Sequence, residues 1–183
     1  SGKTTLLSIL SGMDIDYEGQ YFYLNEILAK RKKTMADYRL KNIGIVSQEF
    51  KLLEDRNIYE NLAFPLRIFN VSSKEIRFLI EEMLTTFDLN YLSKEFPTTL
   101  SGGEKQRIAI ARALIKKPAY IFADEPTSEL DEETEKKVIK IIEDYQKKGI
   151  KFLIATHSKV IANACETKYH IVNQKLKVLD NRW

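Results

Sequence analysis

A short apolar run that ends in two acids constrains the fold of this chain most. Residues 118–124 read Pro-Ala-Tyr-Ile-Phe-Ala-Asp, and Glu125 follows directly. Such a run is typical of a buried parallel strand that presents polar groups at its carboxyl end. Because side chains alternate across a strand, Asp124 and Glu125 can share one site only if the strand ends there. Pro126 is consistent with that end.

Two further segments repeat this pattern of an apolar run with a polar residue at its end. Residues 42–46 lead to Gln48, and residues 150–156 lead to His157. Helical patterns lie between these strands, as at 132–148, where acids come first, lysines come last and Gly149 follows as a stop. The sequence therefore predicts an α/β fold around a mostly parallel sheet.

The remaining segments are expected to form smaller units outside this sheet. A helical subdomain is expected as an insertion at about 65–98, with Ser72 and Glu75 as a capping box. Residues 13–46 read as β-rich, interrupted by a solvated basic run at 30–33. Residues 169–179 are expected to form an antiparallel hairpin.

Composition narrows the class of protein. The 183 residues are 44% hydrophobic, which is enough for one domain, 1–183, with an inserted subdomain. The net charge of +3 is spread along the chain, so we expect no nucleic acid as a partner. A single cysteine, Cys165, cannot form an internal disulfide and fits a reducing compartment. No run is long enough to span a membrane, and no signal peptide is evident.

A turn at Ser101-Gly102-Gly103 runs straight into a helical pattern. Ser101 can act as an N-cap, and the two glycines let the backbone approach a ligand closely. The free N–H groups and the dipole of the helix that follows favour an anion such as phosphate. Taken alone, the turn is better explained as an ordinary capped helix start, because short motifs of this kind are common.

The chain begins inside what reads as the second half of a P-loop, of which Gly2-Lys3-Thr4 remains. In such a loop the lysine reaches the β- and γ-phosphates, and the hydroxyl of the next residue binds Mg²⁺. We therefore expect these roles for Lys3 and Thr4, and an α-phosphate contact for Thr5. The N-terminus looks cut within this motif, and a piece lacking the first glycine is expected to bind ATP poorly.

The order of these motifs resembles one family. Residues 100–107, Leu-Ser-Gly-Gly-Glu-Lys-Gln-Arg, closely resemble the signature motif of ATP-binding cassette (ABC) ATPases. The resemblance extends over the whole chain, through the P-loop, Q-loop, signature, Walker B, D-loop and H-loop. It implies a P-loop NTPase fold with a small antiparallel β part and a helical subdomain, and ATP and Mg²⁺ as cofactors.

The resemblance also implies roles for residues outside the P-loop. Asp124 would hold Mg²⁺, and Glu125 would deprotonate the water that attacks the γ-phosphate. Gln48 would contact Mg²⁺ and that water, and His157 would contact the γ-phosphate and help hold Glu125. Asp131 keeps the register of the D-loop, whereas Glu129 stands where the family has a small residue.

The same resemblance implies partners. Two ATP molecules would lie between two head-to-tail copies, with Ser101, Gly102 and Gly103 of one copy completing the site formed by Lys3 and Thr4 of the other. A membrane permease on a separate chain would be the second partner, and the protein would lie on the cytoplasmic face of the membrane. Apolar residues between 50 and 66 are candidates for the permease groove.

Three uses of such an ATPase remain open from the sequence. Residues 38–50, with the stretch that runs through Pro65-Leu66, resemble the branch for lipoprotein release, macrolide efflux and bacteriocin export, and most of all the peptide exporters. A regulatory ATPase of the cell-division type, which signals through a permease-like partner, would have identical chemistry. A DNA-repair clamp is disfavoured, because a long coiled coil would separate its P-loop half from its signature half.

Overall fold

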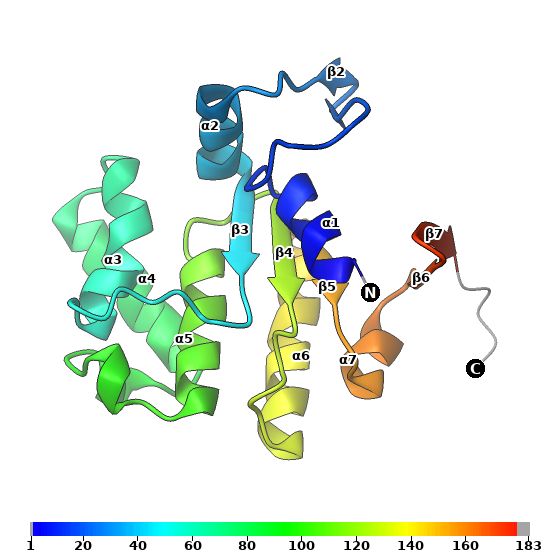
Figure 1. The fold of residues 1–183 in the computed structure, drawn as a ribbon. Helices are drawn as coiled ribbons and strands as arrows, with labels where there is room; N and C mark the ends of the chain where they lie inside the picture. Colours follow the sequence, from blue (N-terminus) through cyan, green and yellow to red (C-terminus); the bar gives the residue numbers. More distant parts are fainter. Residues whose placement is uncertain (1, 179–183) are drawn as a thin grey trace.

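The centre of the molecule is a three-stranded parallel sheet (Figure 1). The computed structural model describes residues 2–178. The strands are β3 (Ile43–Val46), β4 (Tyr120–Asp124) and β5 (Lys151–Ala155), in the order β3-β4-β5. Gly44 lies opposite Ile121, which lies opposite Phe152. Because all three strands run the same way, their carboxyl ends meet at one edge of the sheet.

Helices cover both faces of this sheet (Figure 1). They are α1 (Lys3–Leu10), α2 (Lys32–Asn42), α5 (Gly102–Leu114), α6 (Glu132–Lys147) and α7 (Lys159–Ala164). The alternation of β4 separates two hydrophobic clusters. Ile121 and Ala123 are buried with residues of α5 and α6, whereas Phe122 is buried with Leu7 of α1 and Tyr38 of α2. The expected α/β sandwich is therefore present.

Two further helices pack beside α5. They are α3 (Ile58–Ile68) and α4 (Ser73–Thr86), followed by the single turns η1 (Asn90–Leu92) and η2 (Pro97–Thr99). The Asn57 side chain caps α3 by accepting from the backbone N–H of Glu60 at 2.9 Å. At Ser72 the hydroxyl accepts from the N–H of Glu75 at 3.3 Å, which is one half of the predicted capping box.

The prediction that residues 13–46 are β-rich was wrong for the second half of that stretch. Before β3, the strands are β1 (Phe22–Tyr23) and β2 (Glu26–Ile27), paired antiparallel, and α2 occupies 32–42. Met35 and Tyr38, spaced one helical turn apart, are buried, and the Tyr38 ring contacts the ring of Tyr23 edge-on at 5.0 Å. The lysines at the start of α2 are solvated, as expected, but they begin a helix.

The C-terminal hairpin is confirmed as far as the structure describes it. β6 (Tyr169–Val172) pairs antiparallel with β7 (Lys175–Val178). Asn173 and Gln174 form the turn, with φ of 49° and 60°, and such left-handed pairs match the twist of the flanking strands. Leu179, the expected last residue of this hairpin, lies outside the described residues. Within residues 2–178, no helix combines the length and apolarity needed to cross a bilayer.

Gly44 shows how closely α5 lies on the sheet. A Cβ built on Gly44 would lie 2.3 Å from Ile121 Cδ1 and 2.6 Å from the carbonyl oxygen of Ala113. The first contact involves a flexible side chain, whereas the second involves the backbone of α5. The helix is therefore in direct backbone contact with β3 at this point.

We expect Gly44→Ala to lower the free energy of unfolding by about 2–3 kcal/mol, because the new methyl group must push α5 away from β3. Urea unfolding of the two proteins followed by circular dichroism measures this loss. Adding Ile121→Val removes the Cδ1 contact but keeps the Ala113 contact, so at most partial recovery is expected. Full recovery in the double variant would contradict a backbone clash.

Candidate active site

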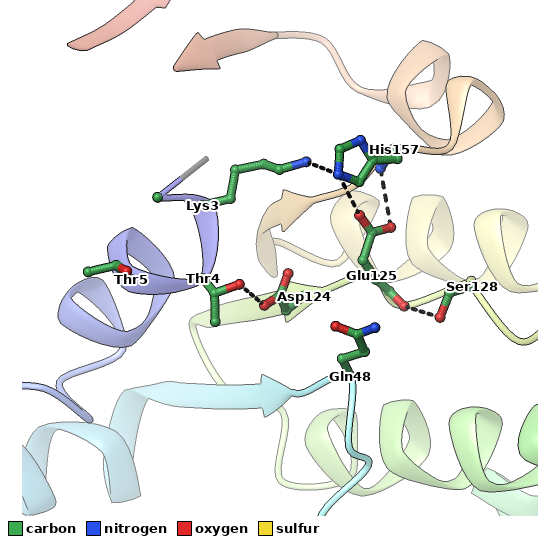
Figure 2. Close-up of a pocket in the computed structure, with 9 residues that line it drawn as sticks. Lys3, Thr4, Thr5, Gln48, Asp124, Glu125, Ser128 and His157 are labelled. Atoms are coloured by element: carbon green, nitrogen blue, oxygen red, sulfur yellow. Dashed lines mark hydrogen bonds and ion pairs between the residues drawn. The ribbon is translucent and has the colours of Figure 1, made fainter. Parts of the chain in front are cut away.

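One cavity of about 620 Å³ lies at the carboxyl edge of the sheet (Figure 2). The loops after the three strands and the first turn of α1 meet there. The lining residues are Gly2, Lys3, Thr4, Thr5, Gln48, Asp124, Glu125, Ser128 and His157. The structure therefore brings together the P-loop residues, the two acids of β4, the glutamine after β3 and the histidine after β5.

The backbone turns sharply at Glu125, directly after β4. Glu125 has a φ of +47°, in the left-handed region, which costs a non-glycine residue about 1–2 kcal/mol. Its N–H donates to the carbonyl of Ala155 at 2.8 Å, and its carbonyl accepts from Gln106 Nε2 at 2.8 Å. This turn ends the alternation of β4, so both carboxylates face one cavity, as the sequence required.

Thr4 and Asp124 place two side-chain oxygens next to each other in the cavity. The Thr4 hydroxyl donates to Asp124 Oδ2 at 2.7 Å, and the Gln48 amide faces the same space (Figure 2). Mg²⁺ prefers hard oxygen ligands and usually takes one or two from the protein, filling the rest with water and substrate phosphate. The Thr4 hydroxyl beside the single carboxylate of Asp124 fits this coordination preference of Mg²⁺. The described residues hold no cluster of three His, Cys, Asp or Glu that could form an all-protein metal cage.

The Glu125 carboxylate is held from β5. Its Oε2 accepts from the Thr156 hydroxyl at 3.1 Å and from the N–H of His157 at 3.2 Å. The Glu125 side chain is 18% exposed, whereas that of His157 is 82% exposed. One oxygen is thus fixed by two donors, and Oε1 lies 3.9 Å from His157 Nε2, which leaves it free to act on a water.

Lys3 reaches across the cavity to the loop after β5. Its Nζ lies 3.0 Å from His157 Nε2 and 3.2 Å from the carbonyl of Thr156, to which it donates. An ammonium can only donate, so this contact is a hydrogen bond only when His157 Nε2 is the accepting nitrogen of the ring. The Thr156 carbonyl carries no net charge, and a charged phosphate oxygen would bind the Lys3 ammonium more strongly than these two partners do.

The start of α1 supplies free backbone donors. Gly2 caps the helix with a φ of +81°, a conformation open to glycine, and its carbonyl accepts from Leu6. The first N–H groups of α1 therefore open toward the cavity, where they favour an anion. Thr5 lines the cavity but lies on the side of α1 away from the two carboxylates (Figure 2).

The turn at Ser101–Gly103 does not line this cavity; it starts α5 elsewhere in the molecule. Ser101 and Glu104 form a complete capping box: the Ser101 hydroxyl accepts from the Glu104 N–H at 3.3 Å, and Glu104 Oε2 accepts from the Ser101 N–H at 2.9 Å. The Ser101 hydroxyl also donates to Glu104 Oε2 at 2.7 Å. Tyr91 donates to the other oxygen of Glu104 at 2.7 Å and holds the pKa of that carboxyl below its usual value. Asp131 lies outside the cavity as well, where it caps α6 by accepting from Thr134.

Comparison with known proteins assigns the family. Residues 1–128 match the family model described as ABC transporter. The chain belongs to the ABC transporter ATP-binding family. It is 36% identical to the cell division ATP-binding protein FtsE of Escherichia coli (strain K12) over 157 residues, covering 86% of this chain and 71% of that protein.

Two more relatives agree with this assignment. The lipoprotein-releasing system ATP-binding protein LolD of Pseudoalteromonas translucida (strain TAC 125) is 37% identical over 184 residues, covering all of this chain and 79% of LolD. The dimeric ATP-binding cassette MJ0796, solved in a post-hydrolysis state bound to ADP and Pi, has a TM-score of 0.90 at 30% identity, covering 99% of this chain and 82% of that one. The P-loop NTPase fold class is confirmed, and the chain is an ABC ATPase.

The sequence did not reveal some residues that shape the ABC site. Thr156 binds the Glu125 carboxylate, and Gln106 binds the Glu125 carbonyl. Arg112 of α5 donates to the carbonyls of Phe50 and Lys51, two residues with positive φ just after Gln48. The sequence shows Gln106 and Arg112 only as polar residues within an amphipathic helix. That pattern does not indicate which backbone groups they bind.

We expect Thr156→Val to lower the kcat of ATP hydrolysis about 10-fold with little change in KM. The variant frees Glu125 Oε2 from one of its two donors, and a hydrogen bond to a charged group contributes about 1.5–3 kcal/mol. Steady-state phosphate release measures both constants. Thr156→Ser keeps the hydroxyl and should retain most of the activity. An equal loss in both variants would contradict a role for the hydroxyl bond to Glu125, because Thr156→Ser keeps that bond.

Proposed function

We propose that this ABC ATPase hydrolyses ATP as a head-to-tail dimer in which each chain supplies half of each site. The observation that carries the proposal is that, within one chain, the signature turn at Ser101–Gly103 does not line the cavity that contains the P-loop residues. Lys3, Thr4 and the β4 carboxylates line the cavity, whereas Ser101 starts α5 outside it. A phosphate bound at this helix start would belong to a nucleotide held by another copy, because the turn does not line the cavity of its own chain. The dimeric state of the MJ0796 cassette supports this arrangement.

Most of the residues that line the cavity then have a role. Lys3 and the α1 N–H groups bind the β- and γ-phosphates, and Thr5 lies near the α-phosphate. Thr4, Asp124 and Gln48 would hold Mg²⁺, which neutralises charge on the phosphates when bound. Glu125 takes the proton of the attacking water through its free oxygen. His157 can contact the γ-phosphate once Lys3 turns to the nucleotide.

The partner's Ser-Gly-Gly turn closes the site from the other side. The N–H groups at the start of α5, with the Ser101 hydroxyl, would bind the γ-phosphate held by the other copy, and Asp131 would stand in the adjoining D-loop. Hydrolysis removes the γ-phosphate that both chains bind. The dimer would then open, and that motion would act on a membrane permease.

We expect Glu125→Gln in the full-length protein to reduce hydrolysis at least about 100-fold, as loss of a general base does, and to accumulate an ATP-bound dimer. The phosphate ligands remain intact in this variant, so binding survives while chemistry stops. Phosphate release and size-exclusion chromatography with ATP and Mg²⁺ measure the two effects. Normal turnover would remove Glu125 from the role of base.

We expect Ser101→Arg to separate binding from dimerisation. The monomer should keep its ATP affinity within about 3-fold, because this turn lies outside the cavity of its own chain, while the dimer and the hydrolysis are lost to the bulky side chain. Lys3→Met should lose binding as well. Equilibrium binding of a fluorescent ATP analogue, with size-exclusion chromatography, distinguishes the two variants. A Ser101→Arg protein that still dimerises would contradict a shared site.

We further propose that the ATPase powers export of a peptide or small amphipathic substrate through a separate permease. The resemblance of residues 38–66 to exporters supports this, and so does the similarity to LolD. The protein would then lie at the cytoplasmic face of the membrane, bound through the permease, without nucleic acid as a partner. The contiguous P-loop and signature halves argue against a DNA-repair clamp.

A regulatory ATPase of the cell-division type is the second candidate, because FtsE is 36% identical over most of this chain. The two candidates differ in what ATP turnover produces. The ATPase would be reconstituted in vesicles with a candidate permease, and uptake of a labelled cationic peptide would be followed with ATP and with ADP. ATP-dependent uptake that is lost in Glu125→Gln supports export. ATP turnover without uptake, together with ATP-dependent binding of a cell-wall hydrolase, supports regulation.

A further inference from the structure

Gln106 is a buried residue, and both the nitrogen and the oxygen of its side-chain amide form hydrogen bonds. It lies on α5 one turn after Gly103, and it has no exposed surface. Its Nε2 donates to the carbonyl of Glu125 at 2.8 Å, and its Oε1 accepts from the N–H of Glu129 at 2.9 Å. The signature helix therefore holds the backbone of the candidate base and of the D-loop with one amide.

Glu129 in turn lies against the signature glycines. A Cβ built on Gly103 would lie 3.1 Å from the carbonyl oxygen of Glu129, and one built on Gly102 would lie 3.0 Å from Glu129 Oε2. The backbone of Glu129 is thus packed between Gly103 and Gln106. A continuous series of contacts runs from Gly103 through Glu129 and Gln106 to Glu125.

The two ends of this series belong to different sites in the dimer described above. Gly103 would bind the nucleotide held by the other copy, whereas Glu125 acts on the nucleotide of its own chain. Glu125 also has the left-handed backbone that sets the direction of its carboxylate, and the Gln106 amide is one of the bonds that hold this conformation. A shift of the signature turn thereby changes the bond that orients the base.

We propose that Gln106 is a positioning residue that couples the two ATP sites of the dimer. Engagement of the signature turn by the partner's nucleotide is passed through Glu129 and Gln106 to the Glu125 peptide, and it aligns the carboxylate of the second site. The proposal rests on the head-to-tail dimer of the proposed function. Each site then reaches its full rate only when the other is filled.

Three variants of the full-length protein test this coupling. Gln106→Met keeps the volume and loses both hydrogen bonds. Gln106→Glu keeps the acceptor for Glu129 and loses the donor to Glu125 until its carboxyl is protonated. Thr127→Val is the matched control, because it breaks a buried hydrogen bond of 2.7 Å to Glu135 that lies beside the site but does not involve α5.

The first measurement is the ATPase rate against ATP concentration. With two coupled sites the Hill coefficient can approach about 2. We expect Gln106→Met to lower it toward about 1 and to lower kcat about 10-fold, with ATP affinity of the monomer unchanged within about 2-fold. Thr127→Val should keep the Hill coefficient of the wild type. A wild-type coefficient of 1, or an equal fall in the control, would overturn the proposal.

The second measurement uses pH and distinguishes positioning from packing. Burial raises the pKa of a carboxyl group, so Gln106→Glu gains its proton, and with it the donor to the Glu125 carbonyl, as the pH falls. We expect the ratio of its rate to the wild-type rate to rise about 5-fold or more between pH 8 and pH 6. A ratio that stays constant or falls would overturn the proposal. Its failure leaves the trapped dimer of Glu125→Gln intact, whereas failure of the proposed function removes that dimer.

Discussion

The left-handed turn at Glu125 is the constraint on which the rest of the site depends. An extended backbone there would send the carboxylates of Asp124 and Glu125 to opposite faces of the sheet. The turn places both in one cavity, one beside the Thr4 hydroxyl and the other beside Thr156. Its cost is offset by hydrogen bonds from two sides, to Ala155 of the neighbouring strand and from Gln106 of the signature helix. The site is therefore anchored in the sheet core rather than in a loose loop.

In the proposed dimer, the start of α1 binds the nucleotide of its own chain, and the start of α5 binds the nucleotide of the other copy. The start of α1 opens toward the cavity, where Lys3 contacts the Thr156 carbonyl and His157. The start of α5 is capped by Ser101, whose hydroxyl already donates to Glu104. In the proposed dimer that hydroxyl must change partner to reach a phosphate. The strong bond from Tyr91 and the backbone bond from Ser101 would keep Glu104 satisfied while it does so, and the helix cap survives the exchange.

Much of the fold follows from sequence pattern, because the buried strands are continuous apolar runs and their polar ends carry the site. β4 with Asp124 and Glu125, and β5 with His157, were predicted for that reason. α2 was missed because only Met35 and Tyr38 are buried among many charges, which leaves a weak helical period. Gln106 and Thr156 act on Glu125 from 19 and 31 positions away in sequence. Partners of that kind depend on how the helices and strands pack, and no local pattern encodes them.

The close contact at Gly44 gives α5 a pivot. Because the Ala113 carbonyl lies directly against β3, the carboxyl end of the helix cannot move without opening the sheet face. From Ala113 back to Gly102, α5 spans about 16.5 Å at about 1.5 Å per residue, so a tilt of about 5° displaces its amino end by about 1.4 Å. Because Gly44 lets α5 contact β3 near Ala113, a tilt of the helix about this contact moves the signature turn at its amino end farther than any other part of the helix.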